Sequence, residues 1–240
     1  MFEDIKNRER RVDSLQTLTD KIAEEYGNMV SAICRRMIQD QNLAEDVAQE
    51  AWIQIIKSID SFKGKSKLST WIYTICYRVI KKHCEKERIY TTEFLSYHFR
   101  YGRLEVPENI DYDHSIWVKE MCDKCLTGIL HCLDNESRLI YLLRDVAQLE
   151  YEDIAIIINK KEATIRKLIS RARKKLKNFL EDECILFNPY GKCNCRMKEL
   201  VKNIELEDEY AKIRRMAVKV NFFLASEEVL PGKNFWEKYI

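Results

Sequence analysis

Residues 151–177 read YEDIAIIINKKEATIRKLISRARKKLK, and this stretch decides the fold of the second half of the chain. It predicts a short apolar helix, a polar corner and a second helix with one apolar and one basic face. The apolar face comprises Ile165, Leu168, Ile169, Ala172 and Leu176. The remaining positions hold eight cations, namely Lys161, Arg166, Lys167, Arg171, Arg173, Lys174, Lys175 and Lys177. Such a helix suits a DNA major groove, where Lys and Arg displace counterions from phosphates, and the pattern is that of a helix-turn-helix.

The corner between these two helices departs from the ideal. Asn159 tolerates the left-handed conformation that the turn needs, but Lys161 stands where Ser or Thr would cap the second helix better. A basic helix face that is merely solvated is the alternative to DNA binding, so the rest of the chain has to decide between the two.

The composition indicates an all-α protein, because six glycines and three prolines in 240 residues leave few turn signals for strands. The net charge of +2 hides strong local asymmetry. No apolar run approaches a membrane span and the N-terminus lacks a signal-peptide core, so we expect a cytoplasmic protein without membrane contact. In that reducing compartment, nine cysteines favour metal ligation or burial over a disulfide framework.

A capping box, Asn42 with Glu45, predicts a helix that runs to about Ile59. Its buried stripe is expected to comprise Leu43, Val47, Ala51, Ile55 and Ile59. Its first turns are polar and acidic, with Glu45, Asp46, Gln49 and Glu50. The helix dipole alone accounts for acids at this end, and the functional interpretation is a negative patch for a basic partner.

A second helix is predicted over residues 68–82, capped by Ser69. Ile72, Ile75, Cys76, Val79 and Ile80 are expected to face inward. Two rows are expected on its outer surface, Tyr73–Tyr77–Lys81 and Thr74–Arg78–Lys82. Aromatics interleaved with cations suit stacking on unpaired bases. Packing of the two tyrosines under a loop is the alternative.

Two parts of the chain resemble a known family. Ala44–Ile56 (AEDVAQEAWIQII) with Phe62–Arg78 (FKGKSKLSTWIYTICYR) is similar to the second conserved region of bacterial sigma-70 family sigma factors, in the small extracytoplasmic-function class. Leu133–Arg144 (LDNESRLIYLLR), with the helix-turn-helix that follows, resembles the fourth region. The resemblance implies a region 2 bundle over 1–88, a flexible linker over 89–114 and a region 4 helix-turn-helix over 115–181. A Cys-bearing helical extension is expected over 182–240.

The resemblance also implies roles for particular residues. Core RNA polymerase, through its β′ clamp helices and β flap, would be the protein partner, contacted by Asp46, Gln49, Glu50 and Trp52. The melted −10 element would contact Phe62, Lys67, Trp71, Tyr73, Tyr77, Arg78, Lys81 and Lys82. The duplex −35 element would contact Thr164, Arg166, Lys167, Ser170, Arg171, Arg173 and Lys174. An anti-sigma factor is a further partner that the resemblance brings into view.

The sequence departs from the family pattern at two positions. Asn159 replaces the usual Gly of the corner, and Asp134 replaces the usual Pro before the first helix of the fourth region. A helix-turn-helix regulator that never engages polymerase is the alternative function, but it leaves Tyr73, Tyr77 and the acidic 45–50 face without a role. The sequence offers no convergent cluster of acids or nucleophiles of the kind that an enzyme would need.

Five cysteines flank the helix-turn-helix: Cys125, Cys132, Cys184, Cys193 and Cys195. Their thiolates could close a tetrahedral zinc site, although the spacing is not that of a standard finger. The pattern resembles sigma factors whose Cys-bearing C-terminal extension is tied to metal binding or sensing. One structural zinc is therefore expected, with redox or metal sensing and inert buried thiols as open alternatives, and no cofactor is required.

The segments outside the two regions give weaker signals. From Ile89 to Asp113 the pattern loses periodicity, which predicts a tether. Residues 197–225 predict one or two helices, and the aromatic tail 230–240 suggests docking on this protein or on a partner.

Overall fold

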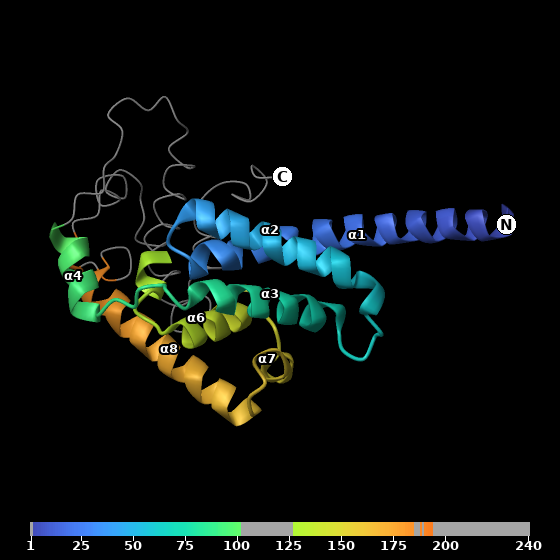
Figure 1. Ribbon diagram of the computed structural model, residues 1–240. Helices are drawn as coiled ribbons and strands as arrows, with labels where there is room; N and C mark the ends of the chain where they lie inside the picture. Colours follow the sequence, from blue (N-terminus) through green and yellow to red (C-terminus); the bar gives the residue numbers. More distant parts are fainter. Residues whose placement is uncertain (1, 102–126, 185–187, 189, 194–240) are drawn as a thin grey trace, which may run out of the picture. The chain divides into compact units, whose positions relative to one another are not determined.

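The structure is a computed structural model that describes residues 2–101, 127–184, 188 and 190–193 of the chain. All regular structure in these residues is helical, which confirms the all-α expectation (Figure 1). The chain divides into two compact units, Met1–Lys86 with Ile156–Ile158, and Glu87–Ala155 with Asn159–Ile240. None of the helices in the described ranges combines the length and apolar character needed to cross a bilayer.

The first unit is built from α1 (Phe2–Met37), α2 (Gln41–Ser58), the short 3₁₀ turn η1 (Ile59–Ser61) and α3 (Leu68–Cys84). Helix α2 packs against both α1 and α3. Its buried side chains include three alanines, Ala44, Ala48 and Ala51, which let the neighbouring helices approach closely. Ile33, Met37, Ile55, Ile72 and Ile80 fill the core, each at most 1 % exposed.

The two predicted helix caps of this unit are wrong. Helix α2 begins at Gln41 because the Asp40 carboxylate, not Asn42, accepts a hydrogen bond from the Leu43 amide at 2.8 Å. Helix α3 begins after Lys67, which makes no capping bond through its side chain, and Ser69 lies inside the helix. Leu43, expected in the buried stripe, is exposed at 36 %, and Ala44 is buried instead.

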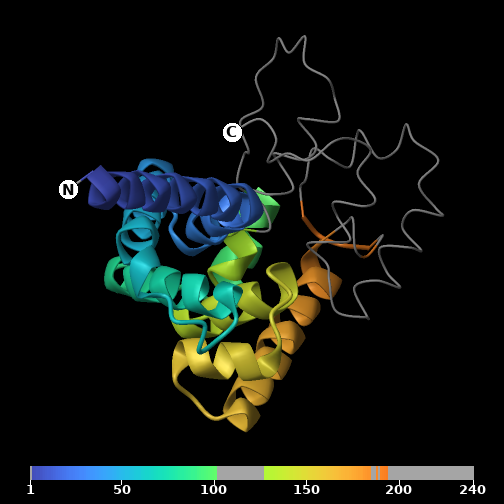
Figure 2. The ribbon, with the colours of Figure 1, turned by 90° about the vertical axis from the view of Figure 1, so that its right-hand side faces the viewer.

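The second unit contains α4 (Thr92–Tyr101), α6 (Asn135–Tyr141), the π-helical turn η2 (Leu142–Val146), the first five residues of α7 (Tyr151–Ile158) and α8 (Glu162–Glu183). Figure 2 shows α7 and α8 meeting at a tight corner. The core under α6 and α8 includes Leu142, Leu143, Ile154, Ile165 and Ile169, none more than 1 % exposed.

Helix α4 corrects the prediction of an aperiodic tether from Ile89 onward. Its packing against α8, and not its own sequence period, stabilises it. The rings of Phe99 and Phe179 lie 5.9 Å apart, and Arg100 forms an ion pair with Glu183. Residues 102–126 of the predicted tether lie outside the described residues.

Candidate nucleic-acid interface

The corner between α7 and α8 has the predicted geometry. Asn159 has a φ of 56°, in the left-handed region that Asn tolerates better than most residues. The Lys161 side chain makes no capping bond, while its carbonyl accepts the Thr164 and Ile165 amides at 2.9 and 3.2 Å. Both expectations for this corner are therefore confirmed.

An aromatic ring supports the corner where the cap is missing. The guanidinium carbons of Arg144 and Arg166 lie 4.5 and 4.0 Å from the centroid of the Tyr151 ring. These cation–π contacts join η2, α7 and α8, and each contributes about 0.5–1 kcal/mol. Sequence reasoning missed Tyr151, whose only signal is an aromatic at the first position of α7.

A buried polar cluster holds α6 against the segment that precedes it. Asp134 caps α6, since its carboxylate accepts the Ser137 amide at 2.8 Å and so replaces the Pro usual in the family. Arg138 is 0 % exposed and donates to the carbonyls of Leu130 and Leu133, each at 3.2 Å. Its Nη1 lies 3.4 Å from Nε2 of His131. Burial, together with the nearby Arg138 charge, lowers the pKa of His131 from 6.5 to about 3.

Four of the basic residues of α8 are engaged within the protein. Arg166 donates from Nε to Glu162 at 2.7 Å, and Arg173 donates from Nε to the buried Asp145 at 2.9 Å. The bond to Asp145 raises the pKa of the Arg173 guanidinium. Lys175 donates to the Cys132 carbonyl at 2.7 Å, and Lys177 lies 3.4 Å from a Glu181 oxygen.

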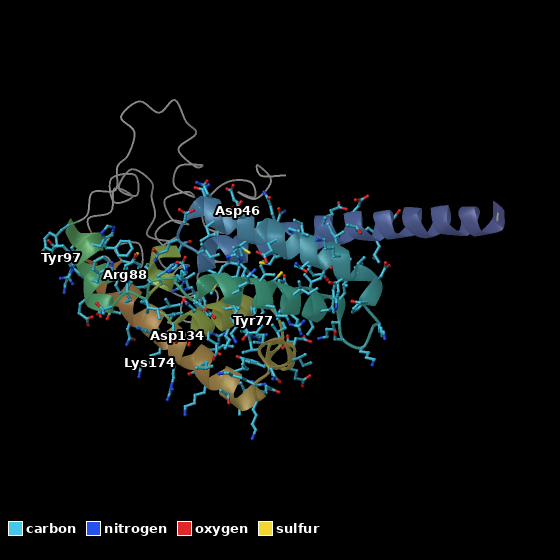
Figure 3. All side chains as sticks on the ribbon, viewed as in Figure 1. Asp46, Tyr77, Arg88, Tyr97, Asp134 and Lys174 are labelled. Carbon is cyan, nitrogen blue, oxygen red and sulfur yellow. The ribbon has the colours of Figure 1, made fainter. Side chains whose placement is uncertain are left out.

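The other cations of α8 form an exposed face. Lys167, Arg171 and Lys174 have no ion-pair or hydrogen-bond partner for their side chains within the described residues, and all three are exposed. Thr164 and Ser170 lie on the same face, because positions three, four and seven apart line one side of a helix. Figure 3 shows Lys174 extending from α8. We call these five residues the α8 face.

On α2, one of the four predicted polymerase-binding residues is bonded within the protein, and the other three are exposed or half-buried. Asp46 and Gln49 are exposed, and Trp52 is half-buried, with Gly27 of α1 beside its ring. Glu50 instead accepts from Lys82 at 3.2 Å and lies 2.8 Å from His83, both on α3. These bonds, that of His83 first, lower the pKa of Glu50. Two residues predicted to serve different partners, Glu50 and Lys82, therefore bind each other.

Tyr73 of α3 is buried, so the prediction that it lies on the outer surface is wrong. It is 4 % exposed, and its ring meets that of Tyr26 edge-on at 6.3 Å, because α1 covers this side of α3. Burial raises the pKa of the Tyr73 hydroxyl.

The other predicted −10 residues remain accessible. Arg78, Lys81 and Lys82 are exposed, with the Lys81 ammonium 5.8 Å from the half-buried Tyr77 ring. Before α3, the rings of Phe62 and Trp71 pair at 5.4 Å, and the nearby Lys67 is exposed.

The cysteines of the expected zinc site are only partly described. Cys125 and Cys195 lie outside the described residues. Cys132 is 1 % exposed, and burial raises the pKa of its thiol, which opposes the thiolate that zinc needs. Cys184 and Cys193 are half-buried, and the Cys193 amide donates to the Glu183 carbonyl at 2.9 Å, beside Cys184. The described residues contain no group of three potential ligands, and the zinc site stays a prediction.

The two units have different features: one contains a helix-turn-helix with an exposed cationic face, and the other carries aromatic and cationic residues on a helical bundle. Residues 22–89 match the family description "Sigma-70 region 2", and residues 123–176 match "Sigma-70, region 4". The chain belongs to the sigma-70 family, in the extracytoplasmic-function class; it binds core RNA polymerase and directs promoter-specific initiation of transcription.

Individual relatives agree with this assignment. The chain is 28 % identical over 171 residues to the ECF RNA polymerase sigma-E factor of Haemophilus influenzae, covering 67 % of this chain and 86 % of the relative. It is 27 % identical over 169 residues to the ECF sigma factor SigW of Bacillus subtilis, covering 67 % and 88 %. Its fold is similar to that of CnrH, solved in complex with the cytosolic domain of CnrY. The TM-score is 0.52 at 16 % identity, over 69 % of this chain and 89 % of CnrH.

Proposed function

We propose that the α8 face reads the −35 element. The observation that carries this proposal is the division of the basic residues of α8, since only Lys167, Arg171 and Lys174 among the predicted contacts are both cationic and unpaired in the described structure. Arg171 offers bidentate hydrogen bonds to a guanine edge, and the two lysines offer charge to phosphates. Arg166 and Arg173 act indirectly, because they fix α8 against Tyr151 and Asp145.

The −10 element is assigned to α3 and the loop before it. Phe62 and Trp71 form an aromatic pair able to receive an unpaired base, and Tyr77 with Arg78 and Lys81 supplies stacking and charge for the strand. Lys67 and Lys82 add exposed cations at the two ends of α3. Tyr73 supports this helix from beneath and makes no contact with DNA.

Core polymerase is assigned to the exposed side of α2. Asp46 and Gln49 with the half-buried Trp52 present an acidic surface with an aromatic anchor, which suits basic β′ clamp helices. The β flap is assigned to the second unit. An anti-sigma factor that binds as the cytosolic domain of CnrY binds CnrH is a further proposed partner. We place the protein in the cytoplasm and assign it no enzymatic activity.

The test is in vitro transcription with purified core polymerase and a promoter library. A defined start site with −10 and −35 preferences is expected. Lys167→Ala/Arg171→Ala should relax the −35 preference alone, while the matched double variant Lys177→Ala/Arg166→Ala should leave the preference at each −35 base unchanged. Absence of both core binding and any start site would refute the assignment to polymerase.

A structural zinc, bound by Cys184, Cys193 and Cys195 with a thiolate from Cys125 or Cys132, stays part of the proposal. Native mass measurement should show one bound zinc that is lost in Cys193→Ser/Cys195→Ser. A fully folded, metal-free wild-type protein would exclude the site.

A further inference from the structure

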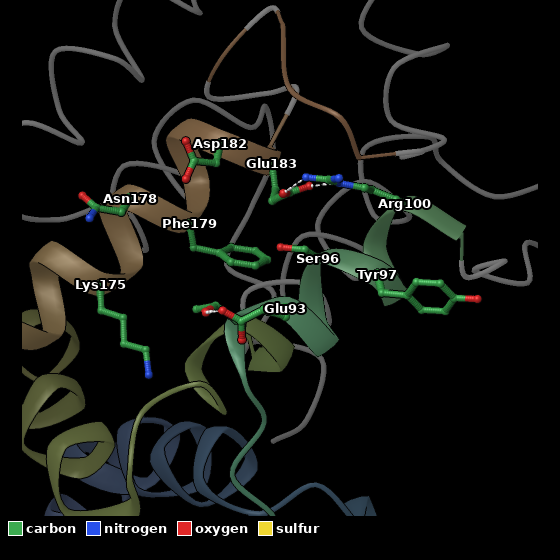
Figure 4. A pocket seen from close by; sticks show the side chains of 10 residues that line it. Glu93, Ser96, Tyr97, Arg100, Lys175, Asn178, Phe179, Asp182 and Glu183 are labelled. Carbon is green, nitrogen blue, oxygen red and sulfur yellow. Dashed lines mark hydrogen bonds and ion pairs between the residues drawn. The ribbon is translucent and has the colours of Figure 1, made fainter.

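A cleft of about 580 Å³ lies between α4 and the C-terminal part of α8. Its walls combine aromatic and charged side chains, among them Tyr97, Phe179, Glu93 and Asp182 (Figure 4). Both helices belong to the second unit, so the cleft depends on that unit alone. No contact in the proposed function uses it.

The net charge of the cleft lining is acidic, with Glu93, Asp182 and Glu183 against Arg100 and Lys175. Arg100 forms an ion pair with Glu183, while Lys175 donates to the Cys132 carbonyl and keeps its charge. Asp182 is exposed and has no hydrogen-bond partner or ion pair within the described residues. Glu93 is exposed and accepts hydrogen bonds only from its own helix start, including the hydroxyls of Thr91 and Thr92. The cleft therefore favours a ligand with positive charge.

The aromatic rim indicates that the ligand also has apolar side chains. Tyr97 is 67 % exposed and Tyr101, which contacts it at a ring distance of 5.0 Å, is 70 % exposed. Phe179 forms the floor at 5 % exposure. Exposed aromatic pairs beside a cleft are typical of surfaces that bind a partner segment.

The chain itself supplies such a segment close by. After α8 it doubles back over the last turn of that helix: Asn188 donates to the Glu181 carbonyl at 2.7 Å, and the Cys193 amide donates to the Glu183 carbonyl. Cys193, the residue before 194–240, is thus bonded to Glu183 in a wall of the cleft. Within 194–240, residues 211–223 (AKIRRMAVKVNFF) carry four cations and no acid, and Ile213, Met216, Ala217 and Val220 recur at helical spacing.

We propose that the cleft between α4 and α8 binds residues 211–223 of the C-terminal extension of the same chain. The cations Arg214 and Arg215 meet Asp182 and Glu93, and the apolar stripe packs on Tyr97 and Phe179. The segment 102–126, which directly follows α4, is the wrong occupant because it carries six acids against three cations. The aromatic tail 230–240 has two lysines and one acid, which is a weaker complement.

The test uses the full chain with a photoreactive p-benzoylphenylalanine in place of Tyr97, whose exposed ring tolerates the change. After irradiation, peptide mapping should place the crosslinks within the same molecule, on residues 211–223. Asp182→Lys should lower the crosslink yield about five-fold, because it turns one exposed attraction into a repulsion. Glu181→Lys, the same change on the same turn but outside the cleft, is the matched control and should leave the yield unchanged.

A charge reversal completes the design. Combining Asp182→Lys with Arg214→Glu should restore the yield. Crosslinks that map to 102–126, to 230–240 or to a second copy of the chain would overturn the proposal, and so would an absence of crosslinks or an equal loss in the two Lys variants.

Discussion

Arg173 and Lys174 are neighbours on α8, but Arg173 is paired with a buried acid and Lys174 is exposed. Substituting each by Ala tests whether the first stabilises the fold and the second contacts DNA. Asp145 is 1 % exposed, and its two carboxylate oxygens accept hydrogen bonds from Nε and Nη2 of Arg173. Removing one partner of a buried ion pair costs about 3–5 kcal/mol. The Arg173 side chain is 28 % exposed, so water moderates the loss and we expect about 3 kcal/mol for Arg173→Ala.

Burial raises the pKa of Asp145, so the carboxyl can protonate once Arg173 is gone, and this sets an upper limit to the loss. Lys174→Ala should change the free energy of unfolding by less than about 0.5 kcal/mol, because Lys174 is exposed. It should instead reduce promoter affinity and lower the slope of log affinity against log salt by about 0.9, the effect of one lost phosphate contact.

Urea unfolding and salt-dependent promoter binding by the holoenzyme measure the two effects. With a urea dependence of about 1–2 kcal/mol per molar, the midpoint of the second unit should fall by about 2 M in Arg173→Ala. Asp145→Asn should be nearly as damaging, and the double variant should lose much less than the sum of the two. The reasoning is refuted if Arg173→Ala unfolds like the wild type and loses promoter affinity as Lys174→Ala does.

Three further predictions follow from buried groups and from the α2–α3 contact. The pKa of His131 falls from 6.5 to about 3 on folding, so between these two pH values the unfolded state binds one more proton than the folded state. The contribution to stability is therefore complete above pH 6.5, and it falls by up to about 1.4 kcal/mol per pH unit down to pH 3. Urea unfolding at a series of pH values should show a weaker pH dependence in His131→Gln. Tyr73→Ala should cost about 3–5 kcal/mol and Tyr73→Phe under about 1.5, whereas Tyr77→Ala should impair promoter opening, measured by permanganate reactivity, without loss of stability. Glu50→Gln should change the affinity for core polymerase by less than about two-fold and lower the free energy of unfolding by up to about 1 kcal/mol. Asp46→Lys should weaken core binding. The opposite ranking of the two variants would mean that Glu50 contacts the polymerase.

Features set by local sequence were predictable. The stripe Ile165, Ile169, Ala172 and Leu176 is buried, at most 5 % exposed, because one face of an amphipathic helix has to leave water. The left-handed Asn159 follows from the few residue types that tolerate that conformation. The family resemblance rested on motifs within these same local elements.

Features set by the position of a third element were not predictable. The period of α3 places Tyr73 at the edge of its inward stripe, and only Tyr26 of α1 decides that this edge is covered. Likewise, α4 forms because Phe99 and Arg100 find Phe179 and Glu183, far away in sequence. The periodicity of a single segment gives no information about such partners, because they lie far away in the sequence.

Because some α8 cations are bonded within the protein, fewer are available to DNA phosphates than the sequence suggests, and the salt dependence of promoter binding should be correspondingly weaker. The seven cations within α8 suggest a salt slope of roughly −6 from this helix, at about −0.9 for each phosphate. Four of them are bonded to acids or to a carbonyl of the protein itself, and of the three that remain on the α8 face, Lys167 and Lys174 are assigned to phosphates. Replacing these two lysines by Ala should therefore lower the slope of the holoenzyme by roughly 2, close to the full contribution of the helix. Replacing Arg166 and Lys177 should leave the slope unchanged, because charges already paired within the protein release no counterions from DNA. A slope that falls equally in both variants would mean that the intramolecular pairs open on the promoter, and that α8 uses its charge twice.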